Sequence, residues 1–292
     1  KIDYKINEND TGKTVESFLK EHGYTHQVLV RLKQTDHGIL RNGIWAYTNE
    51  RLCKDDLITV QIVENECSDN ISPVNLPLDI AYEDDDIIVI NKPFDMPAHP
   101  SAGNHDNTLA NALMYYYGSQ NKPFVYRCIN RLDRDTTGLT IVAKHALAGG
   151  ILGNAVAKRA IHRTYYAVCS GCTPAYMRIS APIARKDAST IERCVDFKRG
   201  ENAVTDFIRI KYNPDNNLSL VKLRLLTGRT HQIRVHMKYI GFPLIGDFLY
   251  NPDYTYISRQ ALHSGRLVFT HPVTGQKMNL ISDIPSDMKS LF

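Results

Sequence analysis

The residues best suited to chemistry in this sequence lie in a short polar turn around Asp133. Two arginines, Arg131 and Arg134, flank this aspartate, and 135–138 supplies the short side chains and the glycine of a tight loop. We expect the Asp133 carboxylate to be ionised, because opposite charges nearby favour the charged form. Such a carboxylate could attack or deprotonate a substrate, and an ordinary surface turn with an ion pair is the alternative interpretation.

The elements that must position this turn are strands and helices in irregular succession. An apolar, β-branched run at 139–143 follows the turn and has the length of a strand, and 87–91 has the same character. Thr108 is a suitable cap for a helix that reaches Tyr116. Residues 146–159 also have helical length, although three glycines weaken this prediction. Alternating β-branched and aromatic residues predict further strands at 163–169, 177–182, 204–212, 218–226, 260–263 and 267–272.

A second polar cluster opens a predicted helix late in the chain. Thr230 can cap this helix, whose apolar stripe includes Ile233 and Met237. Arg229 and Arg234 project from its first turns, where free backbone N–H groups also favour anions. The sequence therefore predicts a cationic site at the start of this helix.

Metal-binding patterns are weak. His231 and His236 are five residues apart, and this spacing does not place them on one helix face as a spacing of four would. Cys169 and Cys172 form a C-x-x-C, but no second pair follows at the spacing of a zinc site. The six cysteines are also too sparse for a disulfide framework. We expect no metal.

Length and composition are those of an ordinary soluble protein. The chain has 292 residues, enough for one large domain or two unequal ones, with 43% hydrophobic and 23% charged residues. No apolar run approaches the roughly 20 residues that span a bilayer. The first ten residues lack the apolar stretch of a signal peptide. We therefore expect a cytoplasmic protein with no membrane segment and no obligate protein partner, and a monomer.

The net charge of +4 is unevenly distributed along the chain. Residues 1–62 carry nine bases and nine acids, and 63–86 carry eight acids and no base. Residues 87–292 carry 26 bases against 14 acids. This surplus favours a polyanionic partner such as nucleic acid, although scattered basic residues also form ordinary solvated surfaces.

Two domains joined by a linker are predicted. Residues 1–62 contain two short amphipathic helices, the second capped by Thr25, and then short strands. Residues 63–76 are polar, acidic and without periodicity, which is typical of a linker that lets its neighbours reorient. Residues 77–292 form the larger domain.

The full string around Asp133, Asn-Arg-Leu-Asp-Arg-Asp-Thr-Thr-Gly-Leu, resembles the signature of the RluA/RluD family of RNA pseudouridine synthases. Further segments are similar to the family over roughly 12–62 and 78–291, including 78–93, 203–207, 226–236, Gly246-Asp247, 261–263 and 269–272. The resemblance implies an α+β fold in which a pseudouridine synthase catalytic domain has a mainly antiparallel mixed sheet flanked by helices. It also implies an isomerase that needs no cofactor, because the reaction oxidises nothing and imports no group.

The resemblance assigns the catalytic roles. Asp133 matches the family's catalytic carboxylate, and Asp135 remains open as a second member of a carboxylate pair of the kind that glycosidases use. Tyr165, in a Lys-x-Tyr element that has Arg163 in place of the lysine, matches the tyrosine that stacks on the target base. Arg234 matches the arginine that holds the carboxylate, with Arg229 as the second choice.

Substrate contacts are also implied by the resemblance. Arg131 would contact the backbone of a flipped nucleotide or fill the gap that it leaves. The other substrate-binding residues expected within these motifs are Arg229, Thr137, Gln232, Ile233 and Leu262.

The N-terminal segment resembles the ribosomal S-four-type RNA-binding domain, also called the α-L domain. Two helices followed by strands, with Leu40-Arg-Asn-Gly and a late Lys-Asp-Asp-Leu-Ile-Thr-Val, carry this similarity. It places on the RNA-facing side Thr25, His26, Arg31, Lys33 and Arg41. A small accessory domain without this role is the alternative.

Three departures from the family pattern stand out. Asn130 takes the place of the usual histidine, Thr137 takes the place of a serine, and the helix after Lys144 is unusually rich in glycine. The first two keep a hydrogen-bonding side chain and affect fine positioning, whereas the third bears on substrate preference.

The sequence therefore predicts an enzyme that isomerises uridine to pseudouridine in structured RNA, with large-subunit ribosomal RNA as the expected substrate. Transfer RNA is the alternative substrate. A non-catalytic RNA-binding protein of the same fold and a nucleoside hydrolase that releases free uracil are the alternative functions.

Overall fold

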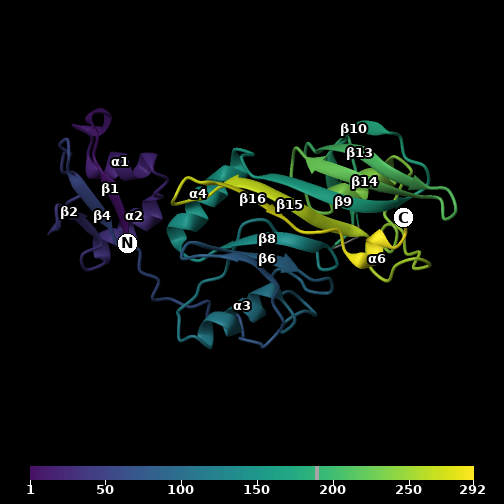
Figure 1. Ribbon diagram of the computed structural model, residues 1–292, viewed down its shortest axis with the longest axis horizontal. Helices are drawn as coiled ribbons and strands as arrows, with labels where there is room; N and C mark the ends of the chain where they lie inside the picture. The colour runs from purple at the N-terminus through teal and green to yellow at the C-terminus, as the bar shows by residue number, and fades with distance from the viewer. Residues whose placement is uncertain (188–190) are drawn as a thin grey trace.

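Strands from the larger part of the chain pair into one ten-stranded sheet that extends along the molecule (Figure 1). The computed structural model describes residues 1–187 and 191–292. The order along the sheet is β10-β13-β14-β9-β15-β8-β6-β5, with β16 paired to β15 and β7 paired to β8. Its pairs are antiparallel except for β8 with β15, so the predicted mainly antiparallel mixed sheet is confirmed. The strands are β5 (Ile80–Glu83), β6 (Ile87–Lys92), β7 (Arg127–Cys128), β8 (Thr137–Ala143), β9 (His162–Ser170), β10 (Tyr176–Ser180), β13 (Val204–Asn213), β14 (Leu218–Leu225), β15 (Leu262–Thr270) and β16 (Lys277–Ile281).

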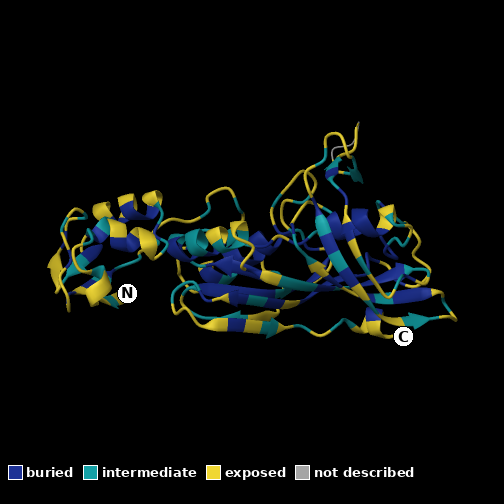
Figure 2. Ribbon diagram, turned by 90° about the horizontal axis from the view of Figure 1, so that it is seen from above, coloured by how far each residue is buried: buried dark blue, intermediate teal, exposed yellow. Residues whose placement is uncertain are grey.

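Helices cover both faces of this sheet, because its central strands are apolar on both sides. In β6, Ile88 and Ile90 pack against α3, whereas Ile87 and Val89 pack against α4. These four side chains are completely buried, and burying each contributes roughly 1.5–3 kcal/mol. Figure 2 shows the same layer as a dark band through the middle of the larger domain. The helices are α3 (Leu109–Gly118), α4 (Ala146–Ala157), α5 (Gln232–Tyr239) and α6 (Ser286–Lys289), and a separate ribbon joins β11 (Ile183–Arg185) to β12 (Arg193–Val195).

In the half of the sheet that contains β9, the helices α5 and α6 cover the two faces in the same way. Ile233 and Met237 of α5 pack on the face that carries Tyr165, and Met288 of α6 packs beside Val168 on the opposite face. Leu262 and Leu267 of β15 lie in the clusters under α5 and α4, respectively. The helices α4 and α5 therefore share one face of the sheet, and the space between them is where a substrate can reach it.

In the larger domain, two of the predicted helix starts are confirmed and one is wrong. Thr108 caps α3 in a capping box with Asn111, and α4 forms despite its glycines. The helix α5 is capped by His231, which has a left-handed backbone (φ 56°) and gives no side-chain cap, so the expected cap at Thr230 does not form. The turn before α5 is held from within the helix instead, by the side chain of Gln232.

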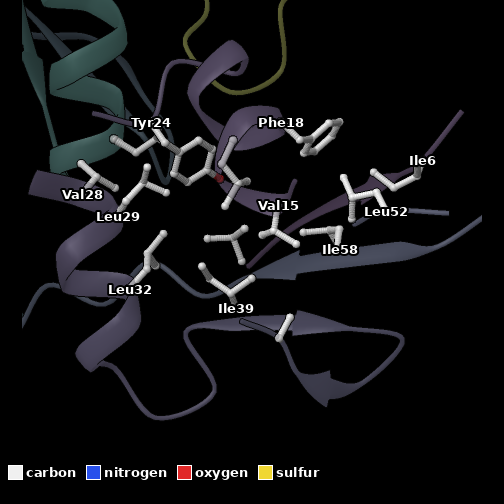
Figure 3. Packing of buried hydrophobic residues seen from close by; sticks show 14 residues of the cluster. Ile6, Val15, Phe18, Tyr24, Val28, Leu29, Leu32, Ile39, Leu52 and Ile58 are labelled. Carbon is white, nitrogen blue, oxygen red and sulfur yellow. The ribbon is translucent and has the colours of Figure 1, made fainter. Parts of the chain in front are cut away.

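The N-terminal residues build a small module with its own sheet and core. Its sheet has the order β1-β4-β2-β3, and α1 and α2 pack on it around Phe18, Leu29 and Ile58 (Figure 3). Thr25 caps α2, as predicted, by accepting a hydrogen bond from the N–H of Val28. Strand β1 was not predicted, although its four residues alternate between apolar and polar side chains, because the segment is short. The elements are β1 (Ile2–Lys5), η1 (Glu8–Asp10), α1 (Val15–Glu21), α2 (His26–Gln34), β2 (Ile39–Arg41), β3 (Ile44–Trp45) and β4 (Leu57–Val60).

The segment between the module and the large sheet contains no helix or strand from residue 61 to residue 79. It is nevertheless hydrogen-bonded to the larger domain. The Ser68 N–H donates to the Phe124 carbonyl (3.2 Å), and the Asn111 side chain donates to the Ser72 carbonyl (2.8 Å). The segment therefore follows the surface of the larger domain and has less freedom than its composition indicated.

Candidate active site

The loop that carries Asp133 is fastened to β8 by Asn130. The Asn130 side-chain oxygen accepts from the Ile141 N–H (2.8 Å), and its amide donates to the Leu139 carbonyl (3.2 Å). The hydroxyl of Thr140 donates to the Asn130 carbonyl (2.6 Å). This buried asparagine thus uses both ends of its amide to fix the loop.

Lys92 also supports the loop that carries Asp133. Its ammonium group donates to the carbonyls of Pro93 (2.7 Å) and Arg134 (2.9 Å), and the residue is almost completely buried. Burial lowers the pKa of Lys92 to about 7, against the opposite influence of Asp135 and Asp133. The sequence analysis did not single out Lys92, although a lysine directly after the apolar run at 87–91 was a usable signal.

A glycine at the start of β8 lets two strands cross closely. Gly138 has φ 105°, and a Cβ atom there would lie 2.3 Å from the carbonyl oxygen of Ser264. No other residue fits this position, because both the backbone conformation and the contact exclude a side chain. The crossing brings β15 beside the Asp133 loop.

Arg234 joins Asp133 to a second carboxylate. Its guanidinium donates to Asp133 over 2.8 Å and to both oxygens of Asp247 over 2.7 and 2.8 Å. Arg234 and Asp247 are buried, whereas the Asp133 side chain keeps 27% of its surface exposed. The fork to Asp247 fixes the guanidinium, which in turn aims the exposed carboxylate.

Aromatic rings complete the surroundings of Arg234. The guanidinium carbon lies 5.4 Å from the ring centre of Phe248 and 5.0 Å from that of Tyr250. Burial disfavours the charge, but the hydrogen bonds to Asp247 and the nearby Asp133 outweigh it and raise the pKa of Arg234. The side chain therefore remains a cation.

Tyr165 lies in the same small pocket as Asp133 and Arg234. This pocket has a volume of about 80 Å³, and its apolar wall comes from Ile233 and Leu262. Burial raises the pKa of the Tyr165 phenol, which therefore stays protonated at neutral pH. Its neighbour in β9, Tyr166, packs on the opposite face of the sheet, as the alternation of a strand requires.

A larger cleft of about 880 Å³ opens beside this pocket and shares with it Arg131, Asp133 and Arg163. It is bounded by the end of α4, the start of β9, the end of β14 and the turn before α5. Asp133 is the one acidic residue among the described residues that line it. Its arginines are Arg131, Arg134, Arg159, Arg163, Arg224 and Arg229. A polyanion that enters this cleft therefore meets a single carboxylate surrounded by arginines.

The arginines predicted at the site divide by their partners. Arg131 is exposed, lines both hollows and makes no ion pair within the described part of the chain. Arg229 also lines both, but it binds the Glu201 carboxylate and the Asn202 carbonyl. Arg234, the first choice, is therefore the partner of Asp133.

Thr137 and Gln232, two predicted substrate contacts, use their side chains in hydrogen bonds within the protein. The Thr137 hydroxyl is buried against His263 Nδ1 (2.9 Å) and does not line the pocket; Thr136 lines it instead. The assignment to Thr137 is corrected for this reason: where the strand begins decides which of two adjacent threonines faces the pocket.

Gln232 borders the pocket with its amide fully engaged. Its oxygen accepts from the Thr227 hydroxyl and the Arg229 N–H, and its nitrogen donates to the Val204 carbonyl and the Thr205 hydroxyl. All four bonds measure 2.8–3.0 Å. Gln232 therefore shapes the turn before α5 and offers no free group to a substrate.

Asp135 does not form a carboxylate pair with Asp133. Both of its oxygens accept from Arg134 over 3.0 Å, and it lines neither hollow. His231 is the closer neighbour, with Nε2 3.8 Å from an Asp133 oxygen and Nδ1 bonded to the Tyr250 hydroxyl. Burial lowers the pKa of His231, despite the opposing charge of Asp133.

Potential metal ligands are engaged in other contacts. Among the described residues, one group with metal-ligand spacing exists, Asp84, Asp86 and His271. His271 Nδ1 accepts two backbone N–H groups, so its proton is on Nε2, which donates to Asp84 (2.9 Å). His236 is held by the Thr205 hydroxyl and a backbone carbonyl, and it belongs to no group of three such ligands among the described residues.

Most residues predicted to face RNA on the N-terminal module make contacts within the protein. Arg31 pairs with Glu66 and Glu64, and Arg41 pairs with Asp56 (2.7 Å). The Thr25 methyl faces α4, where a Cβ added at Gly150 would lie 3.0 Å from it. Intramolecular contacts use these three side chains, and their RNA-facing role stays a prediction. His26 and Lys33 remain on the surface, with Lys33 3.6 Å from Glu16.

Sequence and structure comparisons define the class of protein. The family model described as "RNA pseudouridylate synthase" matches residues 86–239, which include Asp133, Tyr165 and Arg234. The chain belongs to this family. It is an RNA pseudouridine synthase, an isomerase that converts uridine to pseudouridine.

Individual relatives span almost the whole chain. The uncharacterized RNA pseudouridine synthase YjbO of Bacillus subtilis (strain 168) is 38% identical over 96% of this chain and 98% of its own length. The ribosomal large subunit pseudouridine synthase D of Escherichia coli O6:H1 is 36% identical over 98% of this chain and 92% of its own. The structure of human RNA Pseudouridylate Synthase Domain Containing 1 is similar with a TM-score of 0.60, at 26% identity over 71% of this chain and 83% of that one. Within the described residues, no helix has the length and apolarity needed to cross a membrane.

Proposed function

We propose that this enzyme modifies specific uridines in large-subunit ribosomal RNA, with Asp133 as its catalytic carboxylate. The main support for this catalytic site is that Asp133, Tyr165 and Arg234 line one pocket beside a cationic cleft. Support for the substrate comes from relatives named as large-subunit enzymes, at 36–41% identity.

The reaction breaks the bond between uracil N1 and the ribose, turns the base, and joins carbon 5 to the same sugar carbon. Asp133, partly exposed and held by Arg234, is the group placed to react with the nucleotide. The Tyr165 ring offers a face for the uracil during its turn, since stacking on an aromatic ring contributes roughly 1–3 kcal/mol for any base. Ile233 and Leu262 close the pocket around the base.

The nucleotide must leave its helix to reach this pocket. Arg131 and Arg163 lie at the junction of pocket and cleft, where the backbone of an everted nucleotide would pass. Arg229 is a further phosphate contact at the rim, once it exchanges Glu201 for RNA.

We further propose that residues 1–62 form an RNA-binding domain of the S-four type, 63–76 the connecting segment and 77–292 the catalytic domain. Two helices followed by strands in the module support this assignment. Because Arg31 and Arg41 are paired with carboxylates, we expect His26 and Lys33 to make the RNA contacts of the module.

Asp133→Asn tests the catalytic assignment. We expect RNA binding to persist and product formation to fall by about 10³-fold or more, as when an essential group is removed. Tritium release from RNA labelled at uracil carbon 5 measures the reaction, and filter binding measures affinity. Undiminished tritium release by the variant would show that another group carries the chemistry.

Mapping pseudouridines in total RNA with and without the protein tests the substrate. We expect the lost sites to lie in large-subunit ribosomal RNA. Loss confined to transfer RNA would select the alternative substrate, and free uracil as the product would select a hydrolase.

A further inference from the structure

One side chain of the connecting segment touches three separate elements. Glu64 accepts from Arg127 of β7 (2.7 Å) and from the Ala146 N–H at the start of α4 (3.2 Å), and it lies 3.7 Å from Arg31 of α2. Its side chain is only 11% exposed. A residue in a free linker would have no such set of partners, so Glu64 ties the module to the larger domain.

The glycine-rich face of α4 completes the contact. A Cβ at Gly150 would lie 3.0 Å from the Thr25 methyl, and a Cβ at Gly23 would lie 2.5 Å from Ile151. Leu147 of α4 belongs to the same buried cluster as Tyr24 and other residues of the module. Figure 3 shows this helix, in teal at the upper left, next to Tyr24 and Val28. The module and α4 therefore approach closely, with Gly23 and Gly150 at the points of contact.

The same elements reach the catalytic cleft. The other end of α4 contributes Val156 and Ala157 to the cleft wall, and Arg159 follows at its rim. Arg127, the partner of Glu64, begins the short strand whose chain continues into the Asp133 loop. The orientation of the module is therefore set by the helix and the strand that shape the cleft.

We propose that Glu64 is a positioning residue that, together with the glycine face of α4, holds the N-terminal module in one orientation beside the cleft. The proposal rests on the proposed function and names its substrate class: a folded RNA long enough to touch the module and the cleft at once. Binding at two fixed sites gains affinity only when the spacing matches the ligand. A short stem-loop with the target uridine uses the cleft alone.

Two matched pairs of variants test this. Glu64→Lys reverses the charge beside Arg31 and Arg127, and Glu66→Lys reverses a charge that is 64% exposed and pairs with Arg31 alone. Gly150→Leu inserts a side chain against Thr25, whereas Gly153→Leu adds the same side chain to the same helix with nothing within 4 Å of its Cβ.

Small-angle X-ray scattering of the full chain reports the orientation directly. We expect Glu64→Lys and Gly150→Leu to broaden the distance distribution, and their two controls to match the wild type. Unchanged scattering from both test variants would overturn the proposal, whatever the enzyme modifies.

Kinetics on two RNAs report the consequence. On a long folded ribosomal fragment we expect KM to rise about fivefold with kcat unchanged, and on a short stem-loop we expect no change. Equal losses on both RNAs would mean that Glu64 only supports the Asp133 loop, and would overturn the positioning role. If the wild type modified neither RNA, the proposed function would fail while the scattering result still decided the orientation.

Discussion

Two arginines of the cleft and two arginines of the N-terminal module differ in their partners. In the cleft, Arg131 and Arg159 have no carboxylate partner in the described part of the chain. In the module, Arg31 and Arg41 each contact two carboxylates. A paired arginine must give up a partner before it binds phosphate, whereas an unpaired one exchanges only water and counterions. We therefore expect RNA affinity to arise mainly in the cleft, with Arg31 and Arg41 stabilising the module.

Arg234 shows that position alone does not decide this use. It borders the pocket, yet it is buried and bonded to two carboxylates, like a structural arginine. We therefore expect Arg234 to hold Asp133 in place at the pocket, whereas Arg131 and Arg159 of the neighbouring cleft remain available to RNA.

Removing the positioning arginine should have the largest effect. Arg234→Gln leaves the Asp247 carboxylate buried without its cation, and breaking a buried pair in this way costs about 3–5 kcal/mol of unfolding free energy. Activity should fall with it, because Asp133 loses its anchor. Urea denaturation and tritium release measure the two effects.

Asp133→Asn is the matched control for stability, since Asp247 still pairs with Arg234 when Asp133 is neutral. We expect its unfolding free energy to stay within about 1 kcal/mol of the wild type. A variant of Arg234 as stable as this control would contradict the role given to Asp247.

Removing an unpaired arginine should weaken RNA binding and leave the fold intact. For Arg131→Ala we expect about tenfold lower affinity, and a slope of log affinity against log salt that is smaller by about one. Filter binding over a range of salt concentrations measures both. An unchanged salt slope would mean that Arg131 makes no phosphate contact.

Removing a paired arginine of the module should do the reverse. Asp56 is nearly buried and loses one of three donors in Arg41→Ala, keeping the Cys53 N–H and the Asn42 amide. We expect about 1–2 kcal/mol lower stability and RNA affinity within about twofold of the wild type. A large loss of affinity at normal stability would restore Arg41 to the RNA-facing side and would remove the contrast between the two regions.

The sequence predicted which three residues would lie together, because each of them belongs to a local motif. Asp133, Tyr165 and Arg234 come from three separate segments that the family resemblance marks, and all three line one pocket. The sequence did not show which partners the other charged residues would bind. Whether Arg229 or Arg234 meets Asp133, and whether Arg41 meets RNA or Asp56, depends on contacts between residues distant in the chain.

Other errors came from positions where one residue or one backbone angle decides the outcome. Thr136 and Thr137 differ by one position, and this reverses the face on which each lies. His231 starts α5 from a left-handed conformation that no side-chain pattern indicates. The glycines of α4 weakened the helix prediction, although two of them make room for neighbouring side chains.

Lys92 represents a third way to hold a cation, with carbonyl groups as its hydrogen-bond partners, and it should give the smallest effect at neutral pH. Its pKa is about 7 in the folded protein, against roughly 10.4 in an unfolded chain. Between these values the unfolded chain binds a proton that the folded protein does not, so the unfolding free energy should rise with pH. Below pH 7 both states are protonated and the slope should vanish. In Lys92→Met the rise above pH 7 should be absent, which urea denaturation at pH 6.5, 8 and 9.5 can measure. Parallel curves for the two proteins would mean that Lys92 keeps its proton, and that the carbonyls of Pro93 and Arg134 stabilise a buried cation as well as the carboxylates stabilise Arg234.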